Sequence, residues 1–554
     1  MAVVDPQVLV VGSGPAGLVI ALTLAQNGIS IRLIEKLSSF HHSLRGAAIQ
    51  ARSLELFNFL GVYDEMVAGS IPLLPVRSYK FPGGRDIESV IPLAPLVDAT
   101  PDIPFPNPRM LGQAGIESIL RSHLTKLGVE IECSKELVKF EHDSKGVTAE
   151  ILKRGSDNQE TRETARFDFL IGADGARGVT RKQLSLTFLG EPTSNHVLIG
   201  DLFVKGLTPD VFHYWRPSPT DMIILRPSEI EGLFYAVLST ADPSDYPKIS
   251  ASRESLQEFI NKITTRDDII VEGISTLTEF SPNIRVVNKF NEGRVFVVGD
   301  AAHVHSPAGG QGMNSSIQDS FNLGWKLSLV CKKLASLSIL ETYSDERLPI
   351  IQAMLSKTTE VHKKLLQSDI KDKAAWDRPK SLDQLRVNCR WSPILVDEQV
   401  EDHEEAKAIA RDAYGSETDD QLRAGDRAPD APDLVDVKSN EKTSLFSIFK
   451  PSHHTALLFN PSASELPGIL ESLATWPSGT IKYIVVLLKG ADLAEDFRKD
   501  VLVLEDTDGH AYDSYRQMAH GGFPIIIIRP DGVIGGIVKG PEGVKTYYEK
   551  LFAV

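Results

Sequence analysis

Short apolar runs that end in a glycine turn or an acidic residue recur along this chain. Val8 to Val11 is such a run, and it leads through a glycine-rich turn into a helical apolar pattern that ends near Gln26. Ile31 to Ile34 and Val295 to Val298 are two more. Continuous apolar runs bounded by turn residues are typical of buried strands. Strands that alternate with helices in this way predict an α/β fold with a parallel sheet.

The turn after the first strand reads Gly12 to Gly17, GSGPAG. In a GxGxxG turn, Gly12 permits the tight bend, Gly14 lets a pyrophosphate approach the backbone, and Gly17 lets the helix pack closely on the strand. Glu35 ends the second strand, at the spacing where a carboxylate accepts hydrogen bonds from a ribose. GxGxxG alone also occurs in plain βα turns, so the two strands and the acid carry this prediction of dinucleotide binding. The candidate contacts are Gly12, Gly14, Ala16, Gly17, Glu35 and Lys36.

A second segment with the features of a ligand-binding loop is Gly293 to Asn314, GRVFVVGDAAHVHSPAGGQGMN. Its apolar strand ends in Asp300, and a glycine run then enters a helix-like segment from Met313 onward. Glycines let backbone N–H groups approach a ligand closely. The positive end of the following helix favours anionic or electron-rich groups.

A third strand–turn unit, Phe167 to Arg181, carries Asp174-Gly175. The order GxGxxG, DG, GD resembles the flavin-dependent group A monooxygenases, which include para-hydroxybenzoate hydroxylase and phenol hydroxylase. The resemblance spans roughly residues 5 to 360. It implies a Rossmann-type FAD-binding domain, an antiparallel substrate-binding sheet, and NADPH or NADH as co-substrate.

The resemblance also implies roles for single residues. Asp300 would bind the ribityl chain of FAD, and Pro307 would lie against the flavin. Backbone N–H groups around Gly312, Met313 and Asn314 would lie near the flavin pyrimidine ring. Reduced flavin is anionic at that ring, so a helix N-terminus there should stabilise the reduced form.

Four further residues are assigned by the same resemblance. Arg45 would meet the FAD phosphates or the ring, and Gln113 would contact FAD at the start of a helix; a cap or a solvated side chain is the alternative for each. Asp174 and Arg181 belong to a motif associated with both FAD and NAD(P)H, and a plain turn acid is the alternative for Asp174. The chain departs from phenol hydroxylase-like members at Ala47-Ala48, where those members have an aspartate near the substrate ring.

Residues 188–282 lack the nucleotide pattern and contain three runs that read as antiparallel strands. Period-two alternation places His213 on one face of the first strand and Arg226 on one face of the second. The face that looks toward the flavin cannot be assigned from this alternation. The candidate substrate residues are His213, Tyr214, Arg226 and Tyr235, with ordinary sheet packing as the alternative for each. The proline-rich stretch 92–108 is expected to form a stiff loop that borders this layer.

Beyond residue 368 the pattern changes twice. A charged stretch with few apolar residues reads as a surface linker, and a new apolar rhythm begins near Leu445. Its strands and the Pro524–Ile525 start resemble the thioredoxin fold, with a cis bond expected before Pro524. No cysteine follows Cys389, which excludes CxxC redox chemistry there and leaves packing or a homodimer as the expected role. The expected boundaries are 1–187 and 283–368 for the FAD-binding domain, with loop 76–112 in the substrate layer, 188–282 for the substrate-binding sheet, 369–434 for the linker and 435–554 for the thioredoxin-like domain.

Composition narrows the function classes. The 554 residues carry a net charge of −15, which disfavours nucleic acid or an anionic membrane surface as a partner. There is no run of about 18 apolar residues that would predict a membrane span. The only cysteines are Cys133, Cys331 and Cys389, which form neither a disulfide framework nor a metal cluster, so no metal site is predicted. These features lead us to expect a cytoplasmic enzyme.

The expected activity is hydroxylation of a phenolic or hydroxybenzoate-type aromatic, with NAD(P)H and O2 and through a flavin C4a-hydroperoxide. Decarboxylating attack fits the same residues and is not separated from simple hydroxylation. An epoxidase or oxygenase of a terpenoid or polyketide remains an alternative because the FAD motifs are shared. A non-catalytic flavoprotein binding module is a more remote one. A disulfide reductase needs an early cysteine pair, which the chain lacks, and a flavin halogenase needs a WxWxIP motif, which is also missing.

Overall fold

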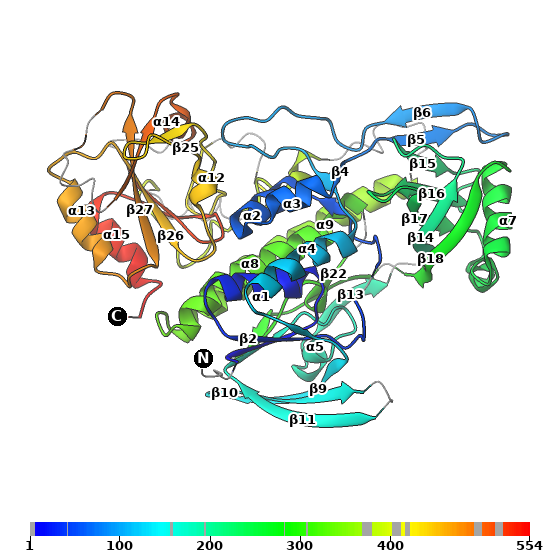
Figure 1. The fold of residues 1–554 in the computed structure, drawn as a ribbon, viewed down its shortest axis with the longest axis horizontal. Coiled ribbons are helices and arrows are strands. Elements are labelled where there is room, and N and C mark those ends of the chain that lie inside the picture. Colours follow the sequence, from blue (N-terminus) through cyan, green and yellow to red (C-terminus); the bar gives the residue numbers. More distant parts are fainter. Residues whose placement is uncertain are drawn as a thin grey trace.

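The protein consists of a nucleotide-binding half, a sheet domain at one end and a C-terminal domain at the other (Figure 1). The structure is a computed structural model. It describes residues 6–40, 42–155, 159–192, 196–281, 283–305, 308–367, 379–400, 412–415, 421–491, 493, 501–515 and 524–553. Pro307 and the Phe523–Pro524 bond lie outside the described residues. Among the helices described, none is long and apolar enough to span a membrane.

The nucleotide-binding half is built on a six-stranded sheet in the order β20-β21-β12-β1-β2-β8. Its central strands β1, β2, β12 and β21 pair in parallel. The first two strands and the helix between them occupy the predicted residues. The bounds are β1 (Val8–Val11), β2 (Ile31–Ile34), β8 (Ile131–Glu132), β12 (Phe169–Gly172), β20 (Asn291–Glu292) and β21 (Val295–Val297).

Helices cover this sheet, and one of them runs through the centre of the molecule. The helices are α1 (Pro15–Gln26), α2 (Ala51–Leu60), α3 (Tyr63–Ala68), α4 (Gln113–Lys126), α5 (Val179–Gln183), α8 (Gly312–Cys331) and α9 (Glu341–Gln367). α1 packs against α4 and α8. Every residue of α8 except Met313 is buried. Its polar side chains therefore need partners inside the protein.

Three small sheets complete this half. One is β3 (Ala48–Ile49), β7 (Arg109–Met110) and β4 (Ile71–Pro72); one is β11 (Glu160–Phe167), β10 (Gly146–Arg154) and β9 (Lys135–Asp143); one is β13 (Phe188–Pro192), β19 (Asn283–Val287) and β22 (His303–Val304).

The sheet domain contains seven strands in the order β18-β14-β17-β16-β15-β5-β6. β15, β16 and β17 are antiparallel neighbours, as predicted. One face packs on α7 (Arg253–Thr264) and α6 (Tyr246–Ile249) through Trp215, Leu225 and Ala236. The strand bounds are β18 (Ile270–Phe280), β14 (Val197–Lys205), β17 (Leu233–Ser239), β16 (Met222–Pro227), β15 (Phe212–Trp215), β5 (Val76–Tyr79) and β6 (Ile87–Ile91).

The C-terminal domain has an eight-stranded sheet in the order β23-β30-β29-β26-β27-β28-β24-β25. β26, β27 and β28 are parallel, β29 is antiparallel to β26, and β30 is antiparallel to β29. The strands are β23 (Val396–Asp397), β24 (Leu434–Asp436), β25 (Lys442–Thr443), β26 (His454–Phe459), β27 (Ile481–Leu488), β28 (Leu502–Asp506), β29 (Ile525–Ile528) and β30 (Ile534–Val538). The helices are α12 (Leu445–Ile448), α13 (Leu466–Ala474), α14 (His510–Tyr515) and α15 (Gly540–Glu549).

The prediction of a surface linker is corrected over residues 424–431, which are buried. Charge pairs inside the protein explain how so polar a segment is buried. Arg390 Nε donates to Asp426 Oδ1 at 2.7 Å, and Arg427 donates to the Asp102 carbonyl at 2.9 Å. Since each buried charge has a partner, the polar composition does not require exposure.

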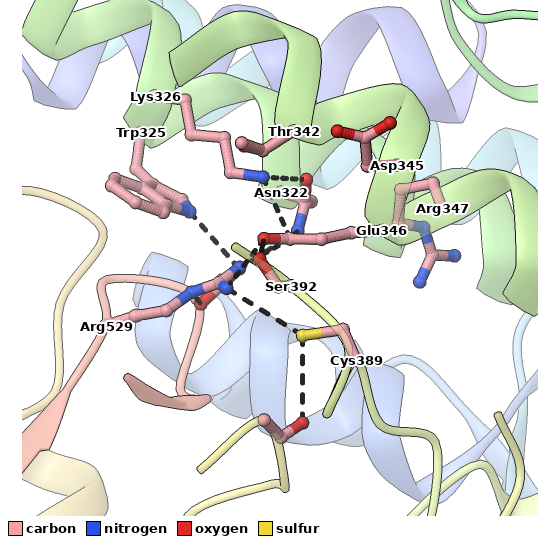
Figure 2. A network of polar contacts seen from close by, with 12 residues as sticks. Asn322, Trp325, Lys326, Thr342, Asp345, Glu346, Arg347, Cys389, Ser392 and Arg529 are labelled. Carbon is pink, nitrogen blue, oxygen red and sulfur yellow. Dashed lines mark hydrogen bonds and ion pairs between the residues drawn. The ribbon is translucent and has the colours of Figure 1, made fainter. Parts of the chain in front are cut away.

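A buried polar network joins this C-terminal domain to α8 and α9 (Figure 2). Lys326 and Glu346 come from the two helices, and Arg529 and Asp531 from the turn after β29. All four side chains are buried. The two domains therefore share one interior.

Candidate FAD and substrate site

Two glycines of the GxGxxG turn are packed closely against other atoms, and the third faces open space. A Cβ atom on Gly12 (φ +104°) would lie 2.4 Å from the Ala173 carbonyl oxygen, and one on Gly17 would lie 2.0 Å from the Gly12 carbonyl oxygen. A Cβ on Gly14 would meet no atom within 4 Å. Gly14 is also the N-cap of α1, and no side chain caps that helix end. Backbone N–H groups at an uncapped helix end beside open space suit a pyrophosphate.

Glu35 lies beside this turn and is only partly buried. Its carboxylate accepts hydrogen bonds from Ser13 N–H and Oγ–H, each at 2.9 Å, and from Leu37 N–H at 3.0 Å. Lys36 is exposed. Ala16 is buried, and its carbonyl accepts a hydrogen bond from Ser320 of α8 at 2.9 Å. The role of Ala16 in this structure is thus contact between α1 and α8.

Asp300 follows β21 and is exposed to solvent. Protein nevertheless surrounds it closely enough that burial raises its pKa, an effect that His303 and Arg45 oppose. An accessible carboxylate in low-polarity surroundings is a common feature of ligand sites. Gly299 just before it has φ +59°, and a Cβ there would lie 2.8 Å from Ser316 Oγ.

A buried ion network behind Asp300 holds this loop, and sequence reasoning missed it. Asp319 of α8 accepts hydrogen bonds from His303 Nε2 at 2.6 Å and from Arg347 Nε at 2.8 Å, and the Gly299 N–H also donates to it. The opposite charges and hydrogen bonds of His303 and Arg347 outweigh burial and lower the pKa of Asp319. The only signal in the sequence is an acid on a helix that is otherwise rich in core residues.

The glycine run reaches α8 through backbone that favours glycine. Gly309 and Gly310 have φ +83° and +62°. The Asn314 side chain donates to the Ala48 and Gly310 carbonyls at 2.8 and 2.7 Å and accepts from Gln50 N–H at 2.9 Å. Asn314 therefore ties the glycine run to β3, so only its backbone N–H could serve a ligand.

Two residues near the tip of α8 complete this end of the site. A Cβ on Gly312 would lie 2.0 Å from the ring of His305, so this ring lies directly against the helix start. Met313 and Gln113 lie on either side of Gly46, near enough for a Cβ there to meet them at 3.6 and 3.7 Å. Gln113 is the first residue of α4 and donates to Glu117 at 2.8 Å. Gln113 and Met313, two of the predicted cofactor residues, thus both lie near Gly46.

The DG motif has an internal structural role. Asp174 Oδ2 accepts hydrogen bonds from Thr180 N–H and Oγ1–H at 2.9 and 3.0 Å, which begins α5. Its buried Oδ1 atom has no hydrogen-bond partner among the described residues. Arg181 donates to the Ala301 carbonyl at 3.3 Å and so joins this motif to the loop of Asp300.

The face of the seven-stranded sheet opposite α7 carries Tyr235 and Arg226 as direct cross-strand partners. The Arg226 guanidinium lies 4.7 Å from the centre of the Tyr235 ring. Burial raises the pKa of Tyr235, and the charges of Arg226 and Arg45 oppose that rise. Arg45 is exposed, and its carbonyl accepts a hydrogen bond from Arg226 Nη2 of the sheet at 3.4 Å. Its charge is one of the lesser influences that oppose the rise in the pKa of Asp300 and of Tyr235.

The other two substrate candidates do not join this pair. His213 lies on the α7 face, where Nδ1 faces the Tyr79 hydroxyl at 2.6 Å and Nε2 faces the Thr208 carbonyl at 2.8 Å. Burial lowers the pKa of His213 to about 4. Tyr214 is on the same face as Arg226 but is buried against Leu93 of the proline-rich loop. Both are packing residues in this structure.

A separate cleft of about 660 Å³ lies along α9 and is lined by Asn291, Glu341, Ser344, Asp345 and Trp391 among others. None of the predicted site residues that the structure describes lines it. We therefore assign the cofactor to the glycine loops and not to this cleft.

Comparisons with known proteins identify the family. A family model described as "FAD binding domain" matches residues 5–358. A flavin-dependent monooxygenase of Mycobacteroides abscessus is 30% identical over 98% of this chain and 99% of its own. The chain belongs to the FAD-dependent monooxygenases. Pentachlorophenol 4-monooxygenase of Sphingobium chlorophenolicum is 28% identical over 96% of this chain and 93% of its own.

The fold of this FAD-dependent monooxygenase is shared by a solved relative over the whole chain. A ternary complex of aklavinone-11 hydroxylase with FAD and aklavinone has a TM-score of 0.77 at 22% identity and covers 100% of both chains. The α/β fold class predicted from the sequence is confirmed. The cofactor is FAD, and NAD(P)H is the co-substrate of this family.

The residues of the monooxygenase fit FAD. The open space at Gly14, the uncapped end of α1 and the partly exposed Glu35 suit the adenosine and pyrophosphate half. The accessible Asp300 and the start of α8 suit the ribityl chain and the ring. When bound, FAD takes electrons from NAD(P)H and activates O2.

Proposed function

We propose that this FAD-dependent monooxygenase hydroxylates a small phenolic ring held between the flavin end and the Tyr235 face of the sheet. The observation that carries the proposal is the contact of Arg226 with both the Tyr235 ring, at 4.7 Å, and the Arg45 carbonyl, at 3.4 Å, which joins the sheet to the cofactor loop. A ring bound there would have the flavin on one side and Tyr235 on the other. The pentachlorophenol enzyme, similar over nearly the whole chain, supports a phenol as substrate.

The chain's own residues have three tasks in this proposal. Glu35, Gly14 and Asp300 bind the cofactor. Tyr235, whose pKa is raised by burial and whose hydroxyl therefore stays protonated, donates its hydroxyl hydrogen to the phenol oxygen. The guanidinium groups of Arg45 and Arg226 stabilise negative charge on that oxygen, which makes the ring more nucleophilic. Ala47 and Ala48 supply no carboxylate, so the phenol proton leaves to water.

We infer several finer properties from the same residues. The co-substrate is NADPH or NADH, the substrate class includes hydroxybenzoates, and loss of CO2 accompanies attack at a carboxylated carbon. The protein acts in the cytoplasm. The C-terminal domain is thioredoxin-like without redox activity, a view supported by its parallel β26–β28 strands and antiparallel β29–β30 hairpin. Its outer face is the candidate surface for a homodimer.

A larger polycyclic aromatic is the second candidate substrate. Aklavinone-11 hydroxylase shares the entire fold, and its structure holds aklavinone. The substrate test therefore compares aromatic compounds with one ring and with several fused rings.

The test is NAD(P)H oxidation by the FAD-loaded protein across phenols, hydroxybenzoates and polycyclic phenols. We expect one of the small phenols to accelerate oxidation and to appear as a hydroxylated product. Acceleration only by polycyclic compounds would favour the second candidate. If no aromatic accelerates oxidation or gains oxygen, the aromatic hydroxylase proposal fails.

A further inference from the structure

Four residues form a single row across four neighbouring strands of the seven-stranded sheet. Thr276 of β18 pairs with Asp201 of β14, Asp201 with Tyr235 of β17, and Tyr235 with Arg226 of β16. Direct cross-strand partners have side chains on the same face. Asp201 is fully buried, with 0% of its surface exposed.

The two charged members of the row bind the backbone of the same short segment of the nucleotide-binding half, Leu44 and Arg45. Asp201 Oδ2 accepts the Leu44 N–H at 3.2 Å. Arg226 Nη2 donates to the Leu44 carbonyl at 3.0 Å and to the Arg45 carbonyl at 3.4 Å. The anion thus accepts from the N–H of Leu44 and the cation donates to the carbonyls of Leu44 and Arg45, with Tyr235 between the two charges in the row.

We propose that Asp201 and Arg226 are positioning residues that hold the Leu44–Arg45 peptide over Tyr235. Arg45 is exposed, and its guanidinium makes no hydrogen bond or ion pair with the described part of the chain, so the contacts of its backbone set the place of the guanidinium. That place determines whether Arg45 serves both Asp300 and the phenol site. The inference deepens the proposed function and rests on it for its catalytic consequence.

Spare hydrogen-bonding capacity distinguishes this pair from ordinary packing. Asp201 Oδ1 and Arg226 Nε are both buried without a partner among the described residues. A sheet held only for stability would be expected to satisfy such groups. Two buried charges with incomplete partners, aimed at a loop of the cofactor site, fit a functional constraint on that loop.

Glu229 binds the backbone of a second segment of the cofactor site, the one that contains Gln113. Its carboxylate accepts the Gly112 N–H at 3.1 Å, directly before Gln113. Arg226 and Glu229, at the end of β16, thus hold the segments of both Arg45 and Gln113. The end of β16 is therefore the place where the sheet controls the geometry of the flavin site.

The test measures the peptide itself before it measures catalysis. Asp201→Ala removes the acceptor of the Leu44 N–H, and Asp201→Asn keeps an acceptor oxygen in its place. Thr276→Val is the matched control, because Thr276 donates to the same Asp201 oxygen at 3.0 Å without touching Leu44. Amide hydrogen exchange is followed in peptides that cover residues 43–46.

We expect exchange there to rise about tenfold in Asp201→Ala and to stay near wild type in Asp201→Asn and Thr276→Val. With FAD bound, iodide should quench the flavin fluorescence of Asp201→Ala more strongly. With an accepted phenol, the share of NAD(P)H consumed without hydroxylated product should rise several-fold. Equal exchange and equal quenching in Asp201→Ala and Thr276→Val would overturn the inference.

Arg226→Met is the second variant if Asp201→Ala does not fold, and the same increase in exchange is expected. Exchange and quenching need no substrate, so they test the positioning role even if every aromatic fails in the activity assay. Failure of that assay with altered exchange would reject the proposed function and keep the positioning role. Hydroxylation of an aromatic in the activity assay together with unchanged exchange would keep the proposed function and reject the positioning role.

Discussion

Glu346 of α9 and Arg529 of the C-terminal domain form a bidentate ion pair in the interior of the protein. The Arg529 Nη1 and Nη2 atoms donate to the two oxygens of Glu346 at 3.0 and 2.9 Å, and neither side chain is exposed. Lys326 Nζ donates to the same carboxylate at 2.8 Å (Figure 2). Asp531 accepts a hydrogen bond from Arg529 Nε at 3.0 Å. These partners hold the pKa of Glu346 well below its usual range.

Loss of one partner of this pair should destabilise the folded protein, because the pair joins the C-terminal domain to α9. Arg529→Met leaves the Glu346 and Asp531 carboxylates buried with fewer cations, which costs about 3–5 kcal/mol of unfolding free energy. Chemical denaturation measures the change. Lys139→Met is the control, since Lys139 and Glu141 form an exposed pair that should contribute nothing measurable. Equal stability of the two variants would contradict a structural role for the buried pair.

Two glycines of the GxGxxG turn should respond differently to a larger residue. Gly14→Val places its side chain where no atom lies within 4 Å, so the protein should fold normally and lose FAD. Gly17→Val places it against the Gly12 carbonyl, so folding itself should fail or weaken. Thermal unfolding of the FAD-free protein and flavin content after purification separate the two effects. If Gly14→Val keeps full FAD, the pyrophosphate does not lie at that turn.

Asp300→Ala should lower FAD retention while the fold persists. Asp300 is accessible and has, among the described residues, no partner comparable to those of Asp319, whose carboxylate binds His303 and Arg347. The ratio of flavin to protein absorbance in the purified variant measures retention. Asp319→Asn is the contrast, because it should reduce thermal stability as well. Unchanged flavin content in Asp300→Ala would remove its assigned role.

Stability should fall as the pH drops below about 6.5, through buried histidines. Burial lowers the pKa of His454 to about 3 and that of His213 to about 4 in the folded protein. An unfolded histidine titrates near pH 6.5 and so binds a proton that the folded form does not, which makes unfolding easier as pH falls. His454→Phe should reduce the slope of unfolding free energy between pH 6 and 4 by about 1.4 kcal/mol per pH unit.

Denaturation curves at several pH values give that slope. The exposed His42 provides a control substitution, His42→Gln, that should leave it unchanged. A slope in His454→Phe equal to that of wild type would mean that His454 is protonated inside the folded protein.

The strands and helix around the GxGxxG turn could be predicted to the residue because their signals are local. Continuous apolar runs, a proline at the start of α1 and glycines at the turn each act within a few residues. Two of the candidate cofactor residues, Gln113 and Met313, both lie near Gly46, and their role toward FAD stays a prediction.

The rest depended on contacts between distant segments. Alternation along β15 separates His213 from Tyr214 but does not say which face meets α7, so His213 was a wrong substrate candidate. The polar segment 424–431 is buried because Arg427 and Asp426 find partners far away in the sequence. Asp201 and Asp319 looked like ordinary residues, since only the fold brings Leu44 to one and His303 to the other.

The central claim is that this protein inserts one atom of O2 into an aromatic ring. The most direct measurement is mass spectrometry of the product formed under ¹⁸O2 with FAD, NAD(P)H and the phenol that most accelerates NAD(P)H oxidation. We expect one ¹⁸O atom in the new hydroxyl group when the label is in O2, and no ¹⁸O there when the label is in water. A product without ¹⁸O, or NAD(P)H oxidation that yields only hydrogen peroxide with every aromatic, would contradict it.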